Sequence, residues 1–297
     1  MGLGEVLSLA CAVCWAIGVV LFKHSGESLS ANNLNFFKNC IATLLIIPTA
    51  LIMEGFTVPE LSPQEWLIVI LSGYFGIAIA DNWYFQALRK IGAGRTAIVA
   101  SLYSPFVILL SIFYLNESLA LWQWLGFVLV ITGILIVVYQ KRYQEVDTHN
   151  LYRGILYAAA SVFLTAMGVV MVKPVLDSGE HGFFWIVLLR LLAGVIGMFI
   201  FMLLRNKLKA VKLEFTTKKH NWFYLISASV FATYLAMLFW LGGFKYTDAS
   251  VASVLNETAN IFIVLLAWFF LQEPLNKRKL AGMALAFSGV VIFIGGI

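Results

Sequence analysis

The sequence predicts an all-α integral membrane protein with ten transmembrane helices, arranged as two inverted five-helix repeats. The first observation is composition: of 297 residues, 61% are hydrophobic and 12% charged, and the mean hydropathy is +0.91. Soluble domains are about half apolar and a quarter charged. The second is that the apolar residues form long runs of about 20, the length that crosses the roughly 30 Å hydrocarbon layer as a helix. Such runs exclude a barrel.

The third observation is that the chain resembles itself. The segment 12–23, AVCWAIGVVLFK, recurs 150 residues later as 162–173, VFLTAMGVVMVK, with a glycine and a final lysine at matching places. At an offset of 156, LNESL (115–119) falls on LQEPL (271–275). Two matches in the same order indicate a duplicated unit, which is typical of transporters built from two halves.

Polar breaks divide the first half into five spans. Basic and glycine residues end the first span at 23–26, an acidic, proline-containing loop precedes the third, and Arg89, Lys90 and two glycines follow it. Asn116 and Ser118 offer caps for the fifth. The predicted spans are 3–22, 33–53, 66–88, 95–114 and 119–139.

The second half repeats this plan after a polar linker. Its predicted spans are 151–176, 183–204, 222–244, 249–271 and 275–297. Because five is an odd number, the second copy enters the membrane from the opposite face, which makes the repeat inverted. We therefore expect a first repeat at 1–139, a linker at 140–153 and a second repeat at 154–297.

Basic residues predict the orientation. Sixteen of the twenty Lys and Arg residues lie in odd-numbered connections, and only Lys173 and Lys245 lie in even-numbered ones. By the positive-inside rule the odd connections are cytoplasmic. We expect a multi-pass protein of the bacterial inner membrane with both termini extracytoplasmic, and no cleavable signal, because nothing basic precedes the first apolar run.

The five-plus-five plan, the glycine-bearing first helix of each half and the Leu-x-Glu-x-Leu turn before each last helix resemble the EamA-type branch of the drug/metabolite transporter (DMT) superfamily. The resemblance covers essentially the whole chain. It implies a secondary transporter with a central cavity lined by the first, third and fourth helices and their counterparts in the second half. The fifth and tenth helices would mainly be scaffold.

Two features depart from related families. The first helix is also similar to that of small multidrug resistance transporters, where a glutamate three residues before the matching glycine carries proton coupling. Here Trp15 and, in the second half, Thr165 occupy that place, so that mechanism does not transfer. Many bacterial EamA-like proteins are also expected to keep both termini in the cytoplasm, the reverse of the charge count.

Ionisable residues inside spans are the first candidates for function, because a charge at mid-bilayer normally faces a cavity or a partner. Glu257 lies in the ninth span within a polar turn that contains Asn256 and Asn260. We predict that the three residues bind substrate; the alternative is that they join helices by hydrogen bonds. The offset of 156 places Ser101 opposite Glu257, whereas an offset of 152 matches another motif, which leaves the register open by one turn.

Asp81 and Asn82 form a second polar patch, in the third span. Asp81 either contacts substrate or pairs internally with Lys38 or Arg190. For Lys38 and Arg190 we favour a structural role, because long basic side chains near helix ends can reach the membrane interface.

Four aromatic residues could line the cavity and suit a flat or amphipathic solute. Most aromatic residues of such a chain face lipid or the interface. The aromatic candidates are Trp15, Tyr103, Tyr234 and Trp240.

Glu117 and Glu273 are interpreted as helix-start caps.

The favoured function is a secondary transporter that moves a small polar or amphipathic, amino-acid-like metabolite by alternating access. No phosphate-binding glycine loop is present for ATP. A proton on Glu257 or Asp81 would couple concentrative transport, while exchange without protons is equally compatible. The alternative is an integral membrane enzyme or lipid flippase, but no paired carboxylate motif accompanies the four histidines.

The expected partners are a small-molecule substrate, the lipid bilayer and, for coupled transport, a proton. We expect no nucleic-acid partner, because the basic residues occupy loops between spans. No cofactor and no metal is expected. Cys11 and Cys14 are spaced like a redox or metal pair, but one turn apart in an apolar helix they are interpreted as small packing residues.

Overall fold

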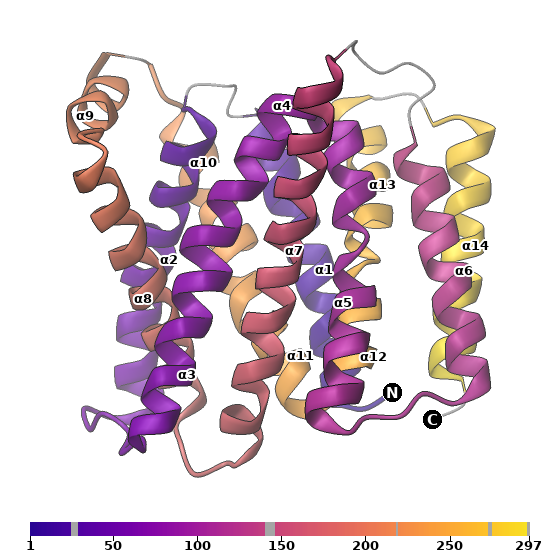
Figure 1. Cartoon of the computed structure of the whole chain (residues 1–297), viewed down its shortest axis with the longest axis horizontal. Coiled ribbons are helices and arrows are strands. Elements are labelled where there is room, and N and C mark those ends of the chain that lie inside the picture. Colours follow the sequence, from indigo (N-terminus) through magenta and orange to yellow (C-terminus); the bar gives the residue numbers. More distant parts are fainter. Residues whose placement is uncertain (25–28, 140–145, 218, 273–274, 296–297) are drawn as a thin grey trace.

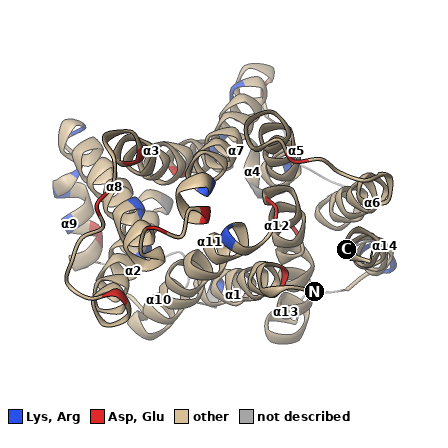
Figure 2. Ribbon diagram, turned by 90° about the horizontal axis from the view of Figure 1, so that it is seen from below, with Lys and Arg blue, Asp and Glu red and all other residues tan. Residues whose placement is uncertain are grey.

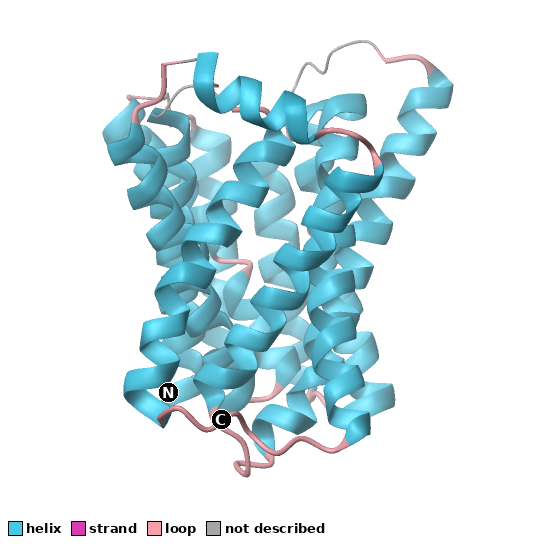
Figure 3. Cartoon of the chain, turned by 90° about the vertical axis from the view of Figure 1, so that its left-hand side faces the viewer, coloured by secondary structure: helices cyan, strands magenta, loops and turns pink. Residues whose placement is uncertain are grey.

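The computed structural model of the chain describes residues 1–24, 29–139, 146–217, 219–272 and 275–295. Within these ranges the regular structure is helical throughout (Figure 3). The first half contributes α1 (Leu3–His24), α2 (Ala31–Glu54), α3 (Pro63–Gly73), the π-helix η1 (Tyr74–Ile79), α4 (Ala80–Ala100), α5 (Tyr103–Leu110), the π-helix η2 (Ser111–Leu115) and α6 (Leu121–Val138).

The second half contributes nine further elements. They are α7 (Thr148–Asp177), α8 (Phe183–Leu204), α9 (Leu208–Thr217), α10 (Trp222–Ser229), the π-helix η3 (Val230–Leu235), α11 (Ala236–Tyr246), α12 (Ala249–Asn256), α13 (Ala259–Leu271) and α14 (Lys277–Ile294).

Nine stretches of the described residues are long and apolar enough to cross a membrane, and they match the first nine predicted spans. Several spans are built from more than one element: α3, η1 and the first part of α4 make the third, and α10, η3 and α11 make the eighth. The tenth predicted span corresponds to α14, which is 18 residues long and begins with Lys277, Arg278 and Lys279. Those three charges keep α14 outside the nine.

The helix starts follow from local sequence. At α3, the Ser62 hydroxyl accepts from the Glu65 backbone N–H at 3.3 Å, and the Glu65 carboxylate accepts from the Ser62 N–H at 2.8 Å, with Pro63 at the first helical position. This reciprocal capping satisfies two donors that a helix start leaves free. At α7, the Asp147 carboxylate accepts from the Asn150 N–H at 3.0 Å, and that hydrogen bond lowers the pKa of Asp147.

Helix irregularities recur 156 residues apart. The π-helices η1 and η3 begin at Tyr74 and Val230, and the left-handed residues Asn116 and Gln272 have φ of 56° and 54°. The fourth and ninth spans are interrupted by turns at 101–102 and 257–258. Each pair differs by 156 positions, so the structural correspondence follows that offset and not 152.

The first helix of each half packs on the other half. α1 lies against α10, η3, α11, α12 and α13, whereas α7 lies against α3, η1, α4 and α5. A Cβ at Gly18 would lie 2.3 Å from the Ala232 Cβ, and one at Gly168 would lie 3.0 Å from the Ser72 carbonyl oxygen. Only glycine permits backbones to approach so closely. The two halves are therefore interlocked.

α6 and α14 form a pair at one edge of the bundle, beyond α5 and α12 (Figure 2). A Cβ at Gly126 would lie 2.7 Å from the Gly289 carbonyl oxygen, and one at Gly133 would lie 2.5 Å from that of Gly282. At the offset of 156, Gly126 corresponds to Gly282 and Gly133 to Gly289. Each glycine therefore meets the counterpart of the other, the contact pattern of a twofold-related interface.

The structure adds one element that the sequence analysis treated as a loop. α9 lies at the end of the molecule opposite the first residues of α1 and the last residues of α14 (Figure 1). Glu214 on α9 accepts from the Ser30 N–H and hydroxyl, both at 2.8 Å, and from the Asn33 amide. These contacts attach α9 to the start of α2.

Candidate functional site

A cavity of about 370 Å³ lies within the bundle. Its walls come from α1, α2, η1, α4, α5, α7, α8, η3, α11, α12 and α13. Both halves of the chain therefore contribute, and the second and seventh spans add Lys38, Asn39 and Arg190 to the helices that the resemblance implied. The volume is that of a small-molecule site.

Glu257 lies in this wall where the ninth span is interrupted between α12 and α13. Its side chain is 7% exposed, and the Asn260 amide donates to Oε2 at 3.2 Å. The Ser253 carbonyl accepts from the Glu257 N–H at 3.2 Å and from the Ser104 hydroxyl at 3.0 Å. The interruption of the ninth span is thus fastened to α5, just after the corresponding interruption of the fourth.

Asn256 and Asn260 also line the cavity. Neither the amide nitrogen nor the amide oxygen of Asn256 has a hydrogen-bond partner among the described residues, although both atoms are buried. A buried amide without partners costs free energy, which a bound polar molecule or water can recover. The predicted polar turn therefore contributes a carboxylate, from Glu257, and an amide without hydrogen-bond partners among the described residues, from Asn256, to the cavity wall.

Asp81 lines the cavity and forms an ion pair with Lys38, with Nζ 3.6 Å from Oδ2. Of the two partners considered for Asp81, the structure selects Lys38. Asn82, one residue later, does not line this cavity: it accepts from Gln86 at 3.0 Å and lines a second pocket of about 520 Å³ beneath α9.

Three of the four candidate aromatic residues line the central cavity. The Trp240 indole donates to the Tyr103 hydroxyl at 3.1 Å, and Trp15, 40% exposed, belongs to the same wall. Tyr234 lies elsewhere, with its hydroxyl 2.7 Å from that of Thr49. The aromatic wall therefore consists of Trp15, Tyr103 and Trp240.

Arg190 was expected to reach the interface, and the structure differs. It is 1% exposed and contributes to the cavity wall from α8. Its guanidinium carbon lies 5.4 Å from the centre of the Trp240 ring. The side chain lies about 10 Å along the axis from the first residue of α8, and the cavity beside it removes the need to reach the membrane surface. The position of Arg190 well inside α8 was the signal in the sequence that could have indicated a place in the cavity wall.

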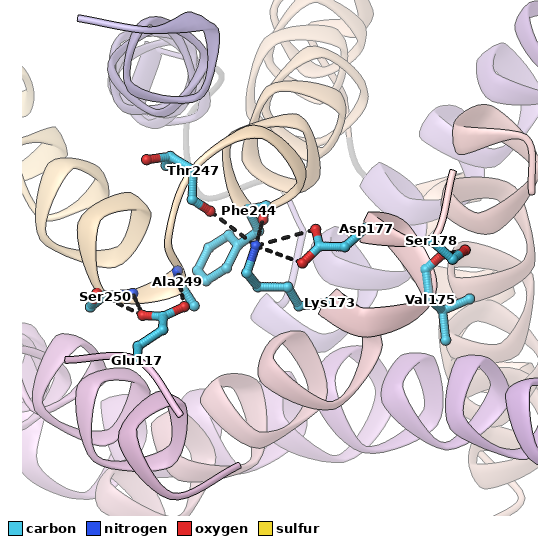
Figure 4. Close-up of polar contacts among 9 residues, drawn as sticks. All are labelled: Glu117, Lys173, Val175, Asp177, Ser178, Phe244, Thr247, Ala249 and Ser250. Atoms are coloured by element: carbon cyan, nitrogen blue, oxygen red, sulfur yellow. Dashed lines mark hydrogen bonds and ion pairs between the residues drawn. The ribbon is translucent and has the colours of Figure 1, made fainter. Parts of the chain in front are cut away.

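Polar contacts link several helices at the end of the bundle that carries the start of α1 (Figure 4). Lys173 donates to the Phe244 carbonyl at 2.6 Å and the Thr247 carbonyl at 3.0 Å, and pairs with Asp177 at 3.0 Å. These bonds join α7 to the end of α11, which leaves Lys173 engaged away from the cavity.

Glu117 caps a helix, although not the one that follows it. Its carboxylate accepts from the Ala249 N–H at 2.7 Å and from the N–H and hydroxyl of Ser250 at 3.0 and 2.7 Å (Figure 4). The first half thereby fixes the start of α12 in the second half. Glu273, the counterpart, lies outside the described residues.

Within the described residues, no group of three or more His, Cys, Asp or Glu side chains is arranged to hold a metal ion. Cys11 and Cys14 are buried thiols that belong to one buried cluster with Ala236. Their place in a small apolar cluster agrees with packing.

Comparison with known proteins gives a consistent result. The model of the EamA-like transporter family matches residues 2–139 and again residues 152–295. An uncharacterized transporter of Archaeoglobus fulgidus is 22% identical over 97% of both chains. The pseudopaline exporter CntI of Pseudomonas aeruginosa is 24% identical over 99% of this chain and 94% of its own.

The fold also has a solved relative. A crystal structure covers 98% of this chain and 96% of its own chain, with a TM-score of 0.80 and 17% sequence identity. At that identity the likeness concerns the fold alone.

Proposed function

Since the chain belongs to the EamA-like transporter family, we propose that it is a secondary carrier that moves a small polar or amphipathic, amino-acid-like metabolite by alternating access. The observation that carries the proposal is the central cavity, which combines Glu257, the Asp81–Lys38 pair and an aromatic wall. A cavity of about 370 Å³ suits a solute of amino-acid size. Because both halves of the chain line the cavity, movement of one half against the other can open it to one side of the membrane at a time.

The architecture proposed for this carrier is ten spans in two inverted repeats, with α14 as the tenth. The recurrence of helix irregularities at 156 residues and the exchanged glycine pairs of α6 and α14 support the repeat. The two family matches, at 2–139 and 152–295, support a division near the linker.

Proton coupling through Glu257 is part of the proposal. Glu257 is a buried carboxyl in the cavity wall with no cation paired to it among the described residues, whereas Asp81 has Lys38. A carboxyl without a cationic partner in a low-dielectric site can take up and release a proton.

Transport into liposomes tests the carrier function. Purified protein should catalyse uptake of radiolabelled amino acids into liposomes preloaded with the same unlabelled solute, with no chemical change of the label. Recovery of a chemically altered product would instead indicate an enzyme. Absence of uptake for every solute that the protein binds would contradict a carrier.

The proposed setting is the bacterial inner membrane, with both ends of the chain extracytoplasmic. The start of α1 and the end of α14 lie at one end of the molecule, and the basic α9 lies at the other (Figures 1 and 3). Alkaline phosphatase, which is active only outside the cytoplasm, should be active when fused after Ile297. An inactive phosphatase fusion together with a fluorescent cytoplasmic reporter at the same place would reverse the orientation.

A further inference from the structure

Arg190 is a buried cation with open hydrogen-bonding capacity. Its Nε and Nη1 atoms are buried and have no hydrogen-bond partner among the described residues, and the residue is 1% exposed. The other cation of the cavity wall, Lys38, has its own carboxylate in Asp81 at 3.6 Å. A membrane-embedded charge without a counter-ion is unfavourable, so an anion bound in the cavity would stabilise Arg190.

The surroundings of Arg190 hold the guanidinium in place and leave room beside it. One face lies over Trp240 at 5.4 Å, and Trp240 is itself fixed by its hydrogen bond to Tyr103 at 3.1 Å. On the π-helix η1, Gly76 has no side chain: a Cβ there would lie 3.7 Å from Nη2. The aromatic ring therefore orients the planar group, and at Gly76 no side chain covers Nη2.

The chemistry of the open group selects the ligand. A guanidinium binds a carboxylate through two parallel hydrogen bonds. With Lys38 and Asp81 paired, the remaining Lys, Arg, Asp and Glu side chains among the described lining residues are Arg190 and Glu257, one of each sign. A doubly charged phosphate would bring two negative charges toward a single free cation, whereas a carboxylate brings one. The unpaired amide of Asn256 is available for a further polar group of the same ligand.

We propose that Arg190 is the residue that binds the substrate, through a carboxylate group of an amino-acid-sized solute. The proposal rests on the carrier function proposed above, because it assigns the substrate class of the same cavity. It predicts that the protein discriminates between a free carboxylate and its neutral amide.

The test measures binding with matched pairs of probes. Thermal unfolding of detergent-purified protein is followed with leucine, phenylalanine and methionine, with the three corresponding amino acid amides, and with inorganic phosphate. At least one amino acid should raise the melting temperature, and its amide should not. Arg190→Gln should weaken binding of that amino acid by about 100-fold, because two charge-assisted hydrogen bonds are lost.

Two further variants control the test. Arg205→Gln makes the same substitution at another arginine over an aromatic ring, 5.3 Å from Phe201, but that arginine is exposed and outside the cavity; it should bind like the wild type. Arg190→Lys keeps the charge and loses the planar fork, so it should bind about 10-fold more weakly. Arg190→Lys decides the question if Arg190→Gln does not fold.

Each other outcome overturns the proposal. Equal stabilisation by acid and amide, unchanged binding in both Arg190 variants, stabilisation by phosphate alone, or no stabilisation of the wild type by any of the amino acids would all contradict it. Failure of the two proposals can be told apart. Amino acid binding without uptake into liposomes contradicts the carrier and keeps Arg190 as the carboxylate site, whereas equal uptake of acids and amides keeps the carrier and contradicts the role of Arg190.

Discussion

The central cavity brings together charged side chains from separate membrane spans. Glu257 and Asp81 stand out because acidic side chains are rare inside apolar spans, and both line the cavity. Arg190 was misjudged because a basic side chain near a helix start has two destinations, the interface or the interior, and only the neighbouring helices decide between them. Asn82 and Tyr234 illustrate the same limit. Each comes directly after a residue that lines the cavity, Asp81 or Thr233, yet makes its own hydrogen bond elsewhere.

At this scale, Glu257→Gln should abolish acceleration of uptake by an imposed proton gradient and preserve exchange of labelled for unlabelled solute. The amide keeps the size of the carboxyl and cannot carry the proton. Uptake and counterflow into liposomes, measured with and without the gradient, give the comparison. Glu60→Gln, at an exposed position, is the control. Full gradient-driven uptake by the Glu257→Gln variant would remove this residue from coupling.

The Asp81–Lys38 pair allows a double-mutant test. Asp81→Asn should lower the stability of the purified protein by about 1–2 kcal/mol, because it leaves the Lys38 ammonium, 13% exposed, without its partner. Lys38→Met with Asp81→Asn should recover most of that loss. Thermal unfolding of the two single variants and the double variant measures the coupling. Additive losses would mean that the two charges do not stabilise each other.

Whole elements were predicted more completely than residues. The nine apolar spans follow from hydropathy alone, because a bilayer requires every backbone polar group to be satisfied within a helix. The π-helices η1 and η3 were not predicted, since both lie within apolar spans, whose hydropathy is the same in an α-helix and in a π-helix. α9 was assigned to a connection because its ten residues are too few to cross a membrane and include Lys209 and Lys212.

The close contact between α6 and α14 gives a prediction for these elements. Gly133→Ala should destabilise the protein by about 2 kcal/mol, because the added methyl would lie 2.5 Å from the Gly282 carbonyl oxygen and forces the helices apart. Melting temperature reports the loss. Leu125→Ala on the exposed face of α6 is the control and should change little. An unchanged melting temperature for Gly133→Ala would mean that the two helices can separate freely.

At the scale of the whole molecule, the repeated units of sequence and the packed units of structure differ. Each half of the sequence contains five predicted spans, but α1 is packed among the helices of the second half and α7 among those of the first. A repeat can be found from matching residues, whereas this exchange of partners depends on contacts between distant segments. Any rocking motion must therefore carry α1 together with α10 to α13.

The exchange makes the two halves interdependent. Residues 1–139 and 146–297, expressed together as separate chains, should co-purify and bind the same solutes as the intact protein. Either fragment alone should aggregate, because α1 or α7 then lacks its partners. Co-expression of 29–139 with 146–297 omits α1 and should also fail. Size-exclusion profiles and solute binding provide the measurements, and a monodisperse, folded single fragment would contradict interlocking.

The packing of α1 also has a consequence for biosynthesis. The first helix leaves the ribosome more than 200 residues before its partners α10 to α13 are complete, which at about 5–20 residues per second corresponds to roughly 10–40 s. During that interval α1 lacks the helices that it contacts in the complete structure. Its Glu5 carboxylate must remain solvated at the membrane surface until Thr247 arrives to donate to it at 2.9 Å. Assembly of the protein is therefore completed late, when the eighth and ninth spans pack against a helix made at the very start.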